Sequence, residues 1–175
     1  MTPYATPIEA TTYFANRLHT EPWDSLQDTQ AAPEIVANLL AIPPVIGVPA
    51  VLFAYHPDKI KALNHATMIL ERLNIRGTKT SLVQELQFPR SPDTAIPADV
   101  KAACCELALA LLDGVDPDLE FENLRMAQQI IGGAKTTYDR TTDVEHIAAG
   151  VPCVAAWRLI KPFMHDTNAV SITRV

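Results

Sequence analysis

Residues 97–114, PADVKAACCELALALLDG, decide the fold class of this protein. Pro97 suits the start of a helix and Gly114 suits its end. Between them, apolar side chains recur with a period near that of the α-helix, as a buried helix face requires: Val100, Ala103, Cys104, Leu107 and Leu111. The stretch therefore predicts a central helix of a helical domain.

The N-terminal region carries a second helix signal. Thr6-Pro7-Ile8-Glu9 is a capping box, with Thr6 as N-cap and Pro7 at the first helical position. We expect this helix to end at Glu21-Pro22 and to bury one face beside Phe14. That face would consist of Ile8, Thr11, Ala15 and Leu18.

The remaining helices are predicted from the same kinds of start and stop signal. The clearest has Asp58 as N-cap and ends by Gly77. Its apolar stripe comprises Ile60, Leu63, Thr67, Leu70 and Leu73. Further helix starts are expected at Pro33, Asp116-Pro117 and Pro152.

Together these signals predict a mainly α fold, a bundle of four to five helices. Residues 129–138 contain Gly132-Gly133 and predict a turn with a short β element. We expect one helical domain over residues 1–164, in which residues 30–58 form an insertion or an enlarged loop. Residues 165–175 would form an extended C-terminal arm.

The inserted segment at 41–55, AIPPVIGVPAVLFAY, is apolar but broken by prolines and a glycine. It fits a buried irregular loop, a short hairpin, or an apolar loop covered by a partner. We expect the third, a subunit or tail interface, because water would otherwise meet these side chains together: Val45, Ile46, Val48, Val51, Leu52 and Phe53.

Composition narrows the class of protein. The 175 residues are 48% hydrophobic and only 19% charged, which suits one globular domain. The first residues resemble no secretory signal, and no apolar run suits a membrane span, so we expect a protein made in a cytoplasm. The three cysteines, Cys104, Cys105 and Cys153, are predicted to be reduced core residues.

Motifs for catalysis are not found. The five histidines have no partner at metal-ligand spacing, and Asp143-Val144-Glu145-His146 fits a solvated helix start better than a metal cluster. Residues 132–136, GGAKT, lack the spacing of a phosphate loop. We therefore predict no enzyme activity, cofactor or metal.

Charge argues against tight binding to DNA. The net charge is −6, whereas a DNA-binding face is concentrated and basic. The one modest basic stretch could be a solvated face or the groove of a single-stranded-DNA-binding protein. It contains Lys59, Lys61, Arg72, Arg76, Lys79 and Arg90.

The motif order resembles a family of small phage proteins. Its most specific part is QELQFPR at 84–90, followed by Ile96-Pro97 and the helix VKAACCELA at 100–108. The family usually has tryptophan where this chain has Phe88. Weaker matches are Ile8-Glu9-Ala10, Tyr13-Phe14, Trp23, Ala62-Leu63, Ala66-Thr67, Leu70 and Gly77-Thr78-Lys79.

Some members of this family are labelled head-tail connectors or adaptors of tailed phages, and others DnaT-like single-stranded-DNA-binding proteins. The adaptor label implies a homo-oligomeric, usually dodecameric, ring between the phage portal protein and a tail-side neck or tail protein. Double-stranded DNA would pass through its lumen without tight binding. Such a protein would assemble in the host cytoplasm and end in the virion neck. The alternative is a single-stranded-DNA-binding accessory protein of phage replication.

Within QELQFPR we predict a structural loop formed by Gln84, Phe88, Pro89 and Arg90. Phe88 would pack on the bundle while Pro89 fixes the direction of the chain. Arg90 would bond to backbone carbonyls or to a helix C-terminus. The alternative is loop sequence without a special role.

The C-terminal residues predict a portal-binding arm. Val170 and Ile172 alternate with polar residues, as in a strand with one buried face, and Arg174 could meet an acidic surface. A strand of this length needs a sheet edge on another chain. The alternative is a disordered terminus.

Overall fold

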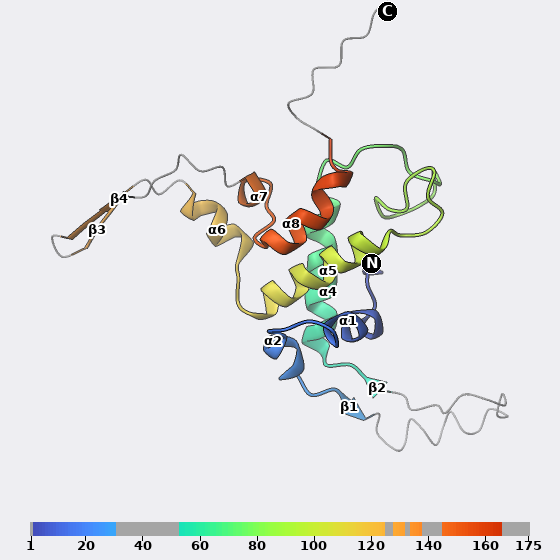
Figure 1. Cartoon of the computed structure of the whole chain (residues 1–175), viewed down its shortest axis with the longest axis horizontal. Coiled ribbons are helices and arrows are strands. Elements are labelled where there is room, and N and C mark those ends of the chain that lie inside the picture. Colours follow the sequence, from blue (N-terminus) through green and yellow to red (C-terminus); the bar gives the residue numbers. More distant parts are fainter. Residues whose placement is uncertain (1, 31–52, 125–127, 132–133, 138–144, 166–175) are drawn as a thin grey trace, which may run out of the picture.

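The structure is a computed structural model that describes residues 2–30, 53–124, 128–131, 134–137 and 145–165. It is mainly helical (Figure 1), as predicted. Helix α5 (Ala98–Leu112) lies at its centre and packs against both α4 (Pro57–Glu71) and α8 (Val154–Ile160). Four of the five residues of the predicted stripe on α5 are fully buried, and Leu111 is partly buried.

Helix α5 is buried almost all round, not on one stripe alone. Cys105, Ala108 and Leu109 are buried together with the predicted face, and so is Glu106. A helix enclosed on several sides carries apolar residues around most of its circumference, because each side contacts another element. Burial raises the pKa of the Cys105 thiol to about 12, and Cys104 beside it is also buried and free. The prediction of core cysteines holds for these two, whereas Cys153 is only partly buried.

The capping box of α1 (Pro7–Phe14) forms as predicted. The Thr6 hydroxyl accepts a hydrogen bond from the Glu9 backbone N–H at 3.3 Å, and the Glu9 carboxylate accepts one from the Thr6 N–H at 2.8 Å. The predicted end of this helix is wrong. It stops at Phe14, and Glu21-Pro22 instead begins a separate short helix, α2 (Glu21–Asp24). Proline fits there because backbone N–H groups in the first helical turn have no acceptor within the helix, so a proline in that turn loses no hydrogen bond.

The buried face predicted for α1 is also wrong. Ile8 and Leu18 are 62% and 80% exposed, and the helix docks through Ala10 and Phe14. Between α1 and α2, His19 adopts a left-handed conformation with φ of 61°. The chain thereby turns back so that Trp23 packs on Phe14, with ring centroids 5.0 Å apart.

Helix α4 begins one residue before the predicted cap. His56 is its N-cap, and Asp58 lies in the first turn. Its predicted stripe is buried except at Ile60, which is 41% exposed. The structure instead buries Lys59, whose ammonium lies 2.9 Å from the Asp28 carboxylate.

The C-terminal helices follow their predicted start signals closely. The Asp116 carboxylate caps α6 (Pro117–Asn123). Two short helices follow, α7 (Glu145–Ala148) and α8, and the second starts just after Pro152. The 3-10 helix η1 (Lys161–Phe163) then extends α8 through Pro162. Residues 72–97 join α4 to α5 without a helix.

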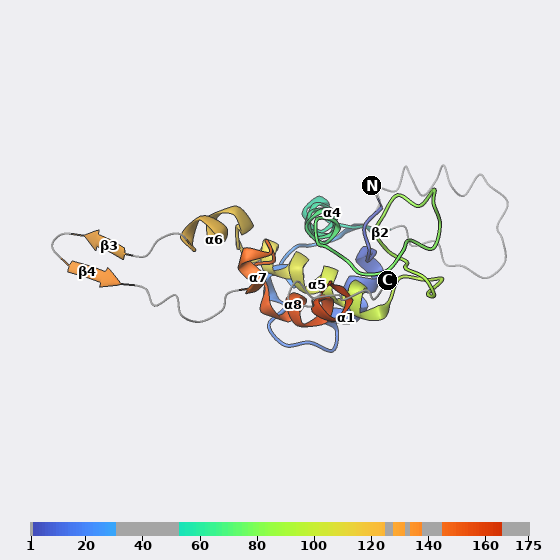
Figure 2. The same ribbon diagram turned by 90° about the horizontal axis from the view of Figure 1, so that it is seen from above.

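Two short antiparallel strand pairs complete the described chain. β1 (Thr29–Gln30) pairs with β2 (Phe53–Ala54). β3 (Gln128–Ile131) pairs with β4 (Ala134–Thr137), with Ile130 opposite Lys135. Both views place β3 and β4 beyond α6 and α7, away from the packed helices (Figures 1 and 2).

Several predictions fall outside the described residues. These are the helix at Pro33, the side chains of the proposed interface segment from Val45 to Phe53, and the arm with Val170, Ile172 and Arg174. Among the helices of the described ranges, each is too short or too polar to cross a lipid bilayer.

Candidate functional site

The loop between α4 and α5 holds the four residues of the predicted structural loop. Its two arms are joined by an antiparallel bridge between Lys79 and Arg90. The Gln84 side-chain amide donates to the carbonyls of Leu86 at 2.9 Å and Pro89 at 2.8 Å. Gln84 thus closes the turn that leads into Phe88-Pro89-Arg90, a peptide segment in which the Phe88–Pro89 bond is cis.

Phe88 connects this loop to the helical core. Its side chain is 2% exposed. Its ring meets Tyr4 edge-on at 5.8 Å between centroids and Phe163 edge-on at 5.6 Å. The N-terminal segment, the loop and η1 therefore meet at one aromatic side chain, which attaches the loop to the helical core.

Arg90 lies on the other side of the same turn. Its guanidinium donates to the backbone carbonyl of Gly77 and to the side-chain oxygen of Gln87. Gly77 has a positive φ of 88°, which glycine adopts without strain. Arg90 therefore joins the start of the loop to its end.

A second anchor, absent from the sequence-based prediction, is the carboxylate of Glu71 at the end of α4. It accepts a hydrogen bond from the Gln87 backbone N–H at 2.8 Å and another from the Tyr4 hydroxyl. Partial burial raises the pKa of Glu71 above its ordinary value of 4.5, although the bond from Gln87 acts in the opposite direction.

The raised pKa of Glu71 predicts a pH-dependent effect of substitution. A carboxyl whose folded-state pKa exceeds its unfolded value favours folding fully at low pH, and that contribution is lost as the pH rises through the folded-state pKa. Glu71→Gln keeps an acceptor oxygen but cannot ionise. We expect its melting temperature to equal that of the wild type near about pH 4 and to exceed it at about pH 7.

Thermal melts of both proteins at the two pH values test this expectation. Glu122→Gln, at an exposed position of α6, controls for loss of one negative charge. A difference between Glu71→Gln and wild type that is the same at both pH values would contradict the assignment.

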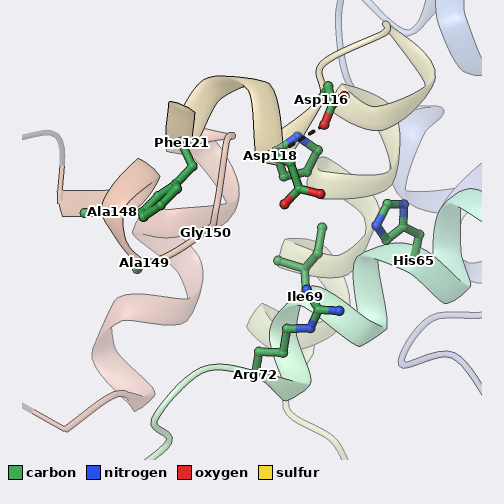
Figure 3. Close-up of a pocket in the computed structure, with 10 residues that line it drawn as sticks. His65, Ile69, Arg72, Asp116, Asp118, Phe121, Ala148, Ala149 and Gly150 are labelled. Atoms are coloured by element: carbon green, nitrogen blue, oxygen red, sulfur yellow. Dashed lines mark hydrogen bonds between the residues drawn. The ribbon is translucent and has the colours of Figure 1, made fainter. Parts of the chain in front are cut away.

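A pocket of about 350 Å³ lies between α4, α6 and the residues after α7. His65 of α4 and its C-cap residue Arg72 line the pocket, and Asp116 and Asp118 face them from the start of α6 (Figure 3). The Asp116 carboxylate is already used, since it accepts the Asp118 backbone N–H at 3.0 Å. The lining carries both charges, which does not suit a phosphate or a substrate of one charge.

The described ranges contain no group of His, Cys, Asp or Glu side chains arranged to hold a metal ion. Asp116 and Asp118 are the two carboxylates that line the pocket. They do not form a free pair, because the Asp116 carboxylate caps α6. The geometry of this pocket thus offers no assignable chemistry.

The basic stretch predicted as a solvated face or a DNA groove is exposed at four of its six residues: Lys61, Arg72, Arg76 and Lys79. Lys59 is buried against Asp28 and lies 5.1 Å from the Trp23 ring centroid. Lys61 pairs with Asp58 at 2.8 Å. Arg90 is bonded within its loop, so Arg72 and Arg76 are the exposed arginines of the stretch.

Two buried ion pairs were not predicted. One is Lys59 with Asp28, and the other joins Arg17 to Glu106 with an Nε–Oε1 distance of 2.5 Å. A carboxylate in the middle of an otherwise apolar helix was a signal for the second pair, because a buried charge needs a partner. No local signal named Arg17 as that partner.

Comparison with known proteins gives one match. Residues 50–175 match the model of a family described as "Putative DnaT-like ssDNA binding protein". No curated protein and no solved structure matches the chain.

Proposed function

We propose, from the premise that this chain belongs to the DnaT-like family, that it is a non-catalytic structural protein, the head-tail adaptor of a tailed phage. In this proposal its copies form a ring below the portal, extend the DNA channel and give the tail a docking platform. The phage part of the proposal rests on the resemblance of QELQFPR and the helix after it to adaptor proteins.

The observation that carries the proposal is the position of β3 and β4. These strands pair with each other beyond the helical core (Figures 1 and 2). A lone two-stranded hairpin is at best marginally stable in water. A hairpin held away from its own core gains stability when another chain covers it, as subunits of a ring do for one another.

The insertion and the C-terminal arm have roles in the same proposal. The apolar residues from Val45 to Phe53 would meet a neighbouring subunit or the tail-side protein. Val170 and Ile172 would add a strand to the portal, and Arg174 would meet an acidic surface there. The neck of the virion is the site of action, after assembly in the host cytoplasm.

The second candidate is a single-stranded-DNA-binding protein. The description of the matched family favours this candidate over the adaptor. Arg72 and Arg76 are the residues on which it would depend, since both are exposed at the C-terminal end of α4 and just beyond it.

Two features of the structure weigh against this second candidate. Single-stranded DNA is bound by stacking on exposed aromatic rings along a basic groove. Here the large rings of Phe14, Trp23, Phe88 and Trp157 are buried in the core, whereas Phe121 on α6 is 41% exposed. The ammonium groups of Lys101 and Lys161 lie against Glu9 and Glu145, which lowers their availability to phosphate.

Two binding measurements test the proposal. We expect the full chain to bind the portal ring of its phage in a pull-down. We also expect no submicromolar binding to a fluorescent single-stranded oligonucleotide at about 0.15 M ionic strength. A bound state that weakens steeply with salt, together with no portal binding, would replace the adaptor by the second candidate.

A charge-reversal pair sharpens the second measurement. If DNA binding is observed, Arg72→Glu with Arg76→Glu should abolish it, whereas Arg158→Glu should not. Arg158 is a matched control because it is an exposed arginine on a different helix, α8.

A further inference from the structure

The loop between α4 and α5 carries two fully exposed apolar side chains. Leu82 and Val83 are 103% and 94% exposed. The loop that carries them stands beside the helical core (Figures 1 and 2). We name Leu82 and Val83 the apolar tip. Exposing two neighbouring apolar side chains to water costs free energy, and this cost is removed when another surface covers them.

Hydrogen bonds hold the apolar tip in an outward position. The Gln84 backbone N–H donates to the Ser81 carbonyl at 3.3 Å and closes a turn around the two residues. The Lys79 ammonium donates to the carbonyls of Gln84 at 3.2 Å and Glu85 at 3.1 Å. The exposure therefore belongs to a bonded turn that is anchored through Phe88 and Arg90.

The same molecule carries an apolar groove on α1 and the first turns of α5. It has a volume of about 340 Å³. Its lining includes Ile8, which is 62% exposed, and the small side chains of Ala98 and Ala102. Within one molecule the apolar tip does not cover the groove, because both side chains of the tip are exposed.

We propose that the apolar tip of one copy inserts into the α1–α5 groove of a second copy of this chain. The inference deepens the proposed adaptor function, on which it rests, by assigning the contact between ring subunits. A leucine and a valine side chain are small enough to enter a groove of this size. Both surfaces are apolar, so the contact removes from water two regions that are costly to expose.

Charge at the margins favours the same partner. Lys79 stands beside the apolar tip, where its ammonium donates to the carbonyls of Gln84 and Glu85. The two charged residues of the groove lining, Glu9 and Lys101, pair with each other at 2.5 Å. Asp99, next to Ala98 of the lining, is exposed in the first turn of α5. Insertion of the tip brings a positive margin toward a negative one, which steers and orients the contact.

Such a contact joins two different surfaces, so each copy keeps one unused tip and one unused groove. Contacts of this type continue from copy to copy and close into a ring when the rotation between copies allows it. The proposed contact is thus of the type that ring assembly needs.

Disulfide trapping between two kinds of copy tests the contact. One copy carries Val83→Cys and the other Ile8→Cys, both with Cys153→Ser so that the partly exposed native thiol does not react. The two full-length proteins are mixed at high concentration and on the portal ring, then oxidised. We expect a mixed dimer whose disulfide links positions 83 and 8, as identified by mass spectrometry.

Thr94→Cys replaces Val83→Cys as the matched control, because Thr94 is an exposed residue elsewhere in the same loop. It should give about tenfold less of the mixed dimer. Equal trapping from Thr94→Cys would overturn the proposed contact.

A double substitution separates this inference from the proposed function. Leu82→Asp with Val83→Asp should weaken assembly about tenfold or more, while the circular dichroism and melting temperature of the monomer stay unchanged. If the double variant assembles like the wild type, the contact is wrong and the adaptor function stands. If the wild type neither assembles nor binds the portal, both are wrong.

Discussion

Replacing Phe88 with alanine should lower the melting temperature of the protein by roughly 6–20 °C. The truncation removes a buried phenyl ring and leaves a cavity, which costs about 3–5 kcal/mol in protein cores. For a chain of this length each kcal/mol corresponds to about 2–4 °C. Thermal unfolding followed by circular dichroism measures the change.

The size of this effect follows from the position of the ring. Phe88 contacts Tyr4 from the N-terminal segment and Phe163 from η1, so its loss frees two further aromatic side chains. The Phe88 backbone N–H also donates to the Tyr4 hydroxyl at 3.3 Å, a bond that depends on the same packing. Segments from both ends of the chain thus depend on one loop residue.

Leu82→Ala is the matched control for Phe88→Ala. It also truncates an apolar side chain of the same loop, but one that is 103% exposed, so the melting temperature should hardly change. Equal melting temperatures for Phe88→Ala and the wild type would show that the loop is not locked to the core by this ring.

Arg17→Met should also destabilise the fold strongly. The Glu106 carboxylate is 4% exposed and accepts hydrogen bonds from Arg17 Nε at 2.5 Å, Arg17 Nη2 at 2.6 Å and the Tyr13 hydroxyl at 2.7 Å. Removing the guanidinium leaves a buried negative charge with the Tyr13 hydroxyl as its remaining donor. Breaking a buried pair in this way costs about 3–5 kcal/mol.

We expect the lower end of that range, because the Arg17 side chain is 32% exposed and water screens part of the interaction. Chemical denaturation of wild type and variant measures the loss of unfolding free energy. The double variant Arg17→Met with Glu106→Leu should recover most of it, since no unpaired charge stays buried.

Lys61→Met gives the comparison at the surface. It breaks the exposed Lys61–Asp58 pair and should change stability little. If Arg17→Met costs no more than Lys61→Met, the buried pair does not hold α1 against α5.

Local sequence determined the features that depend on a few neighbouring residues. The capping box at Thr6 and the cap at Asp116 form because both partners of each bond lie within one helical turn. The central helix α5 follows from an unbroken apolar period between Pro97 and Gly114. Gln84 to Arg90 was singled out by its resemblance to a family motif, and the bonds that Gln84 makes within this segment span only two and five residues.

Only the tertiary structure decided which surfaces meet. The apolar period of α1 is compatible with more than one docking face. The Arg17–Glu106 pair, whose residues are 89 apart in sequence, joins the chain just after α1 to α5. In this arrangement Ile8 stays exposed to water. Likewise, the partners of the loop come from three separate segments: Tyr4 from the N-terminus, Glu71 from the end of α4 and Phe163 from η1. Such contacts depend on side-chain packing between elements, for which one sequence holds no local pattern.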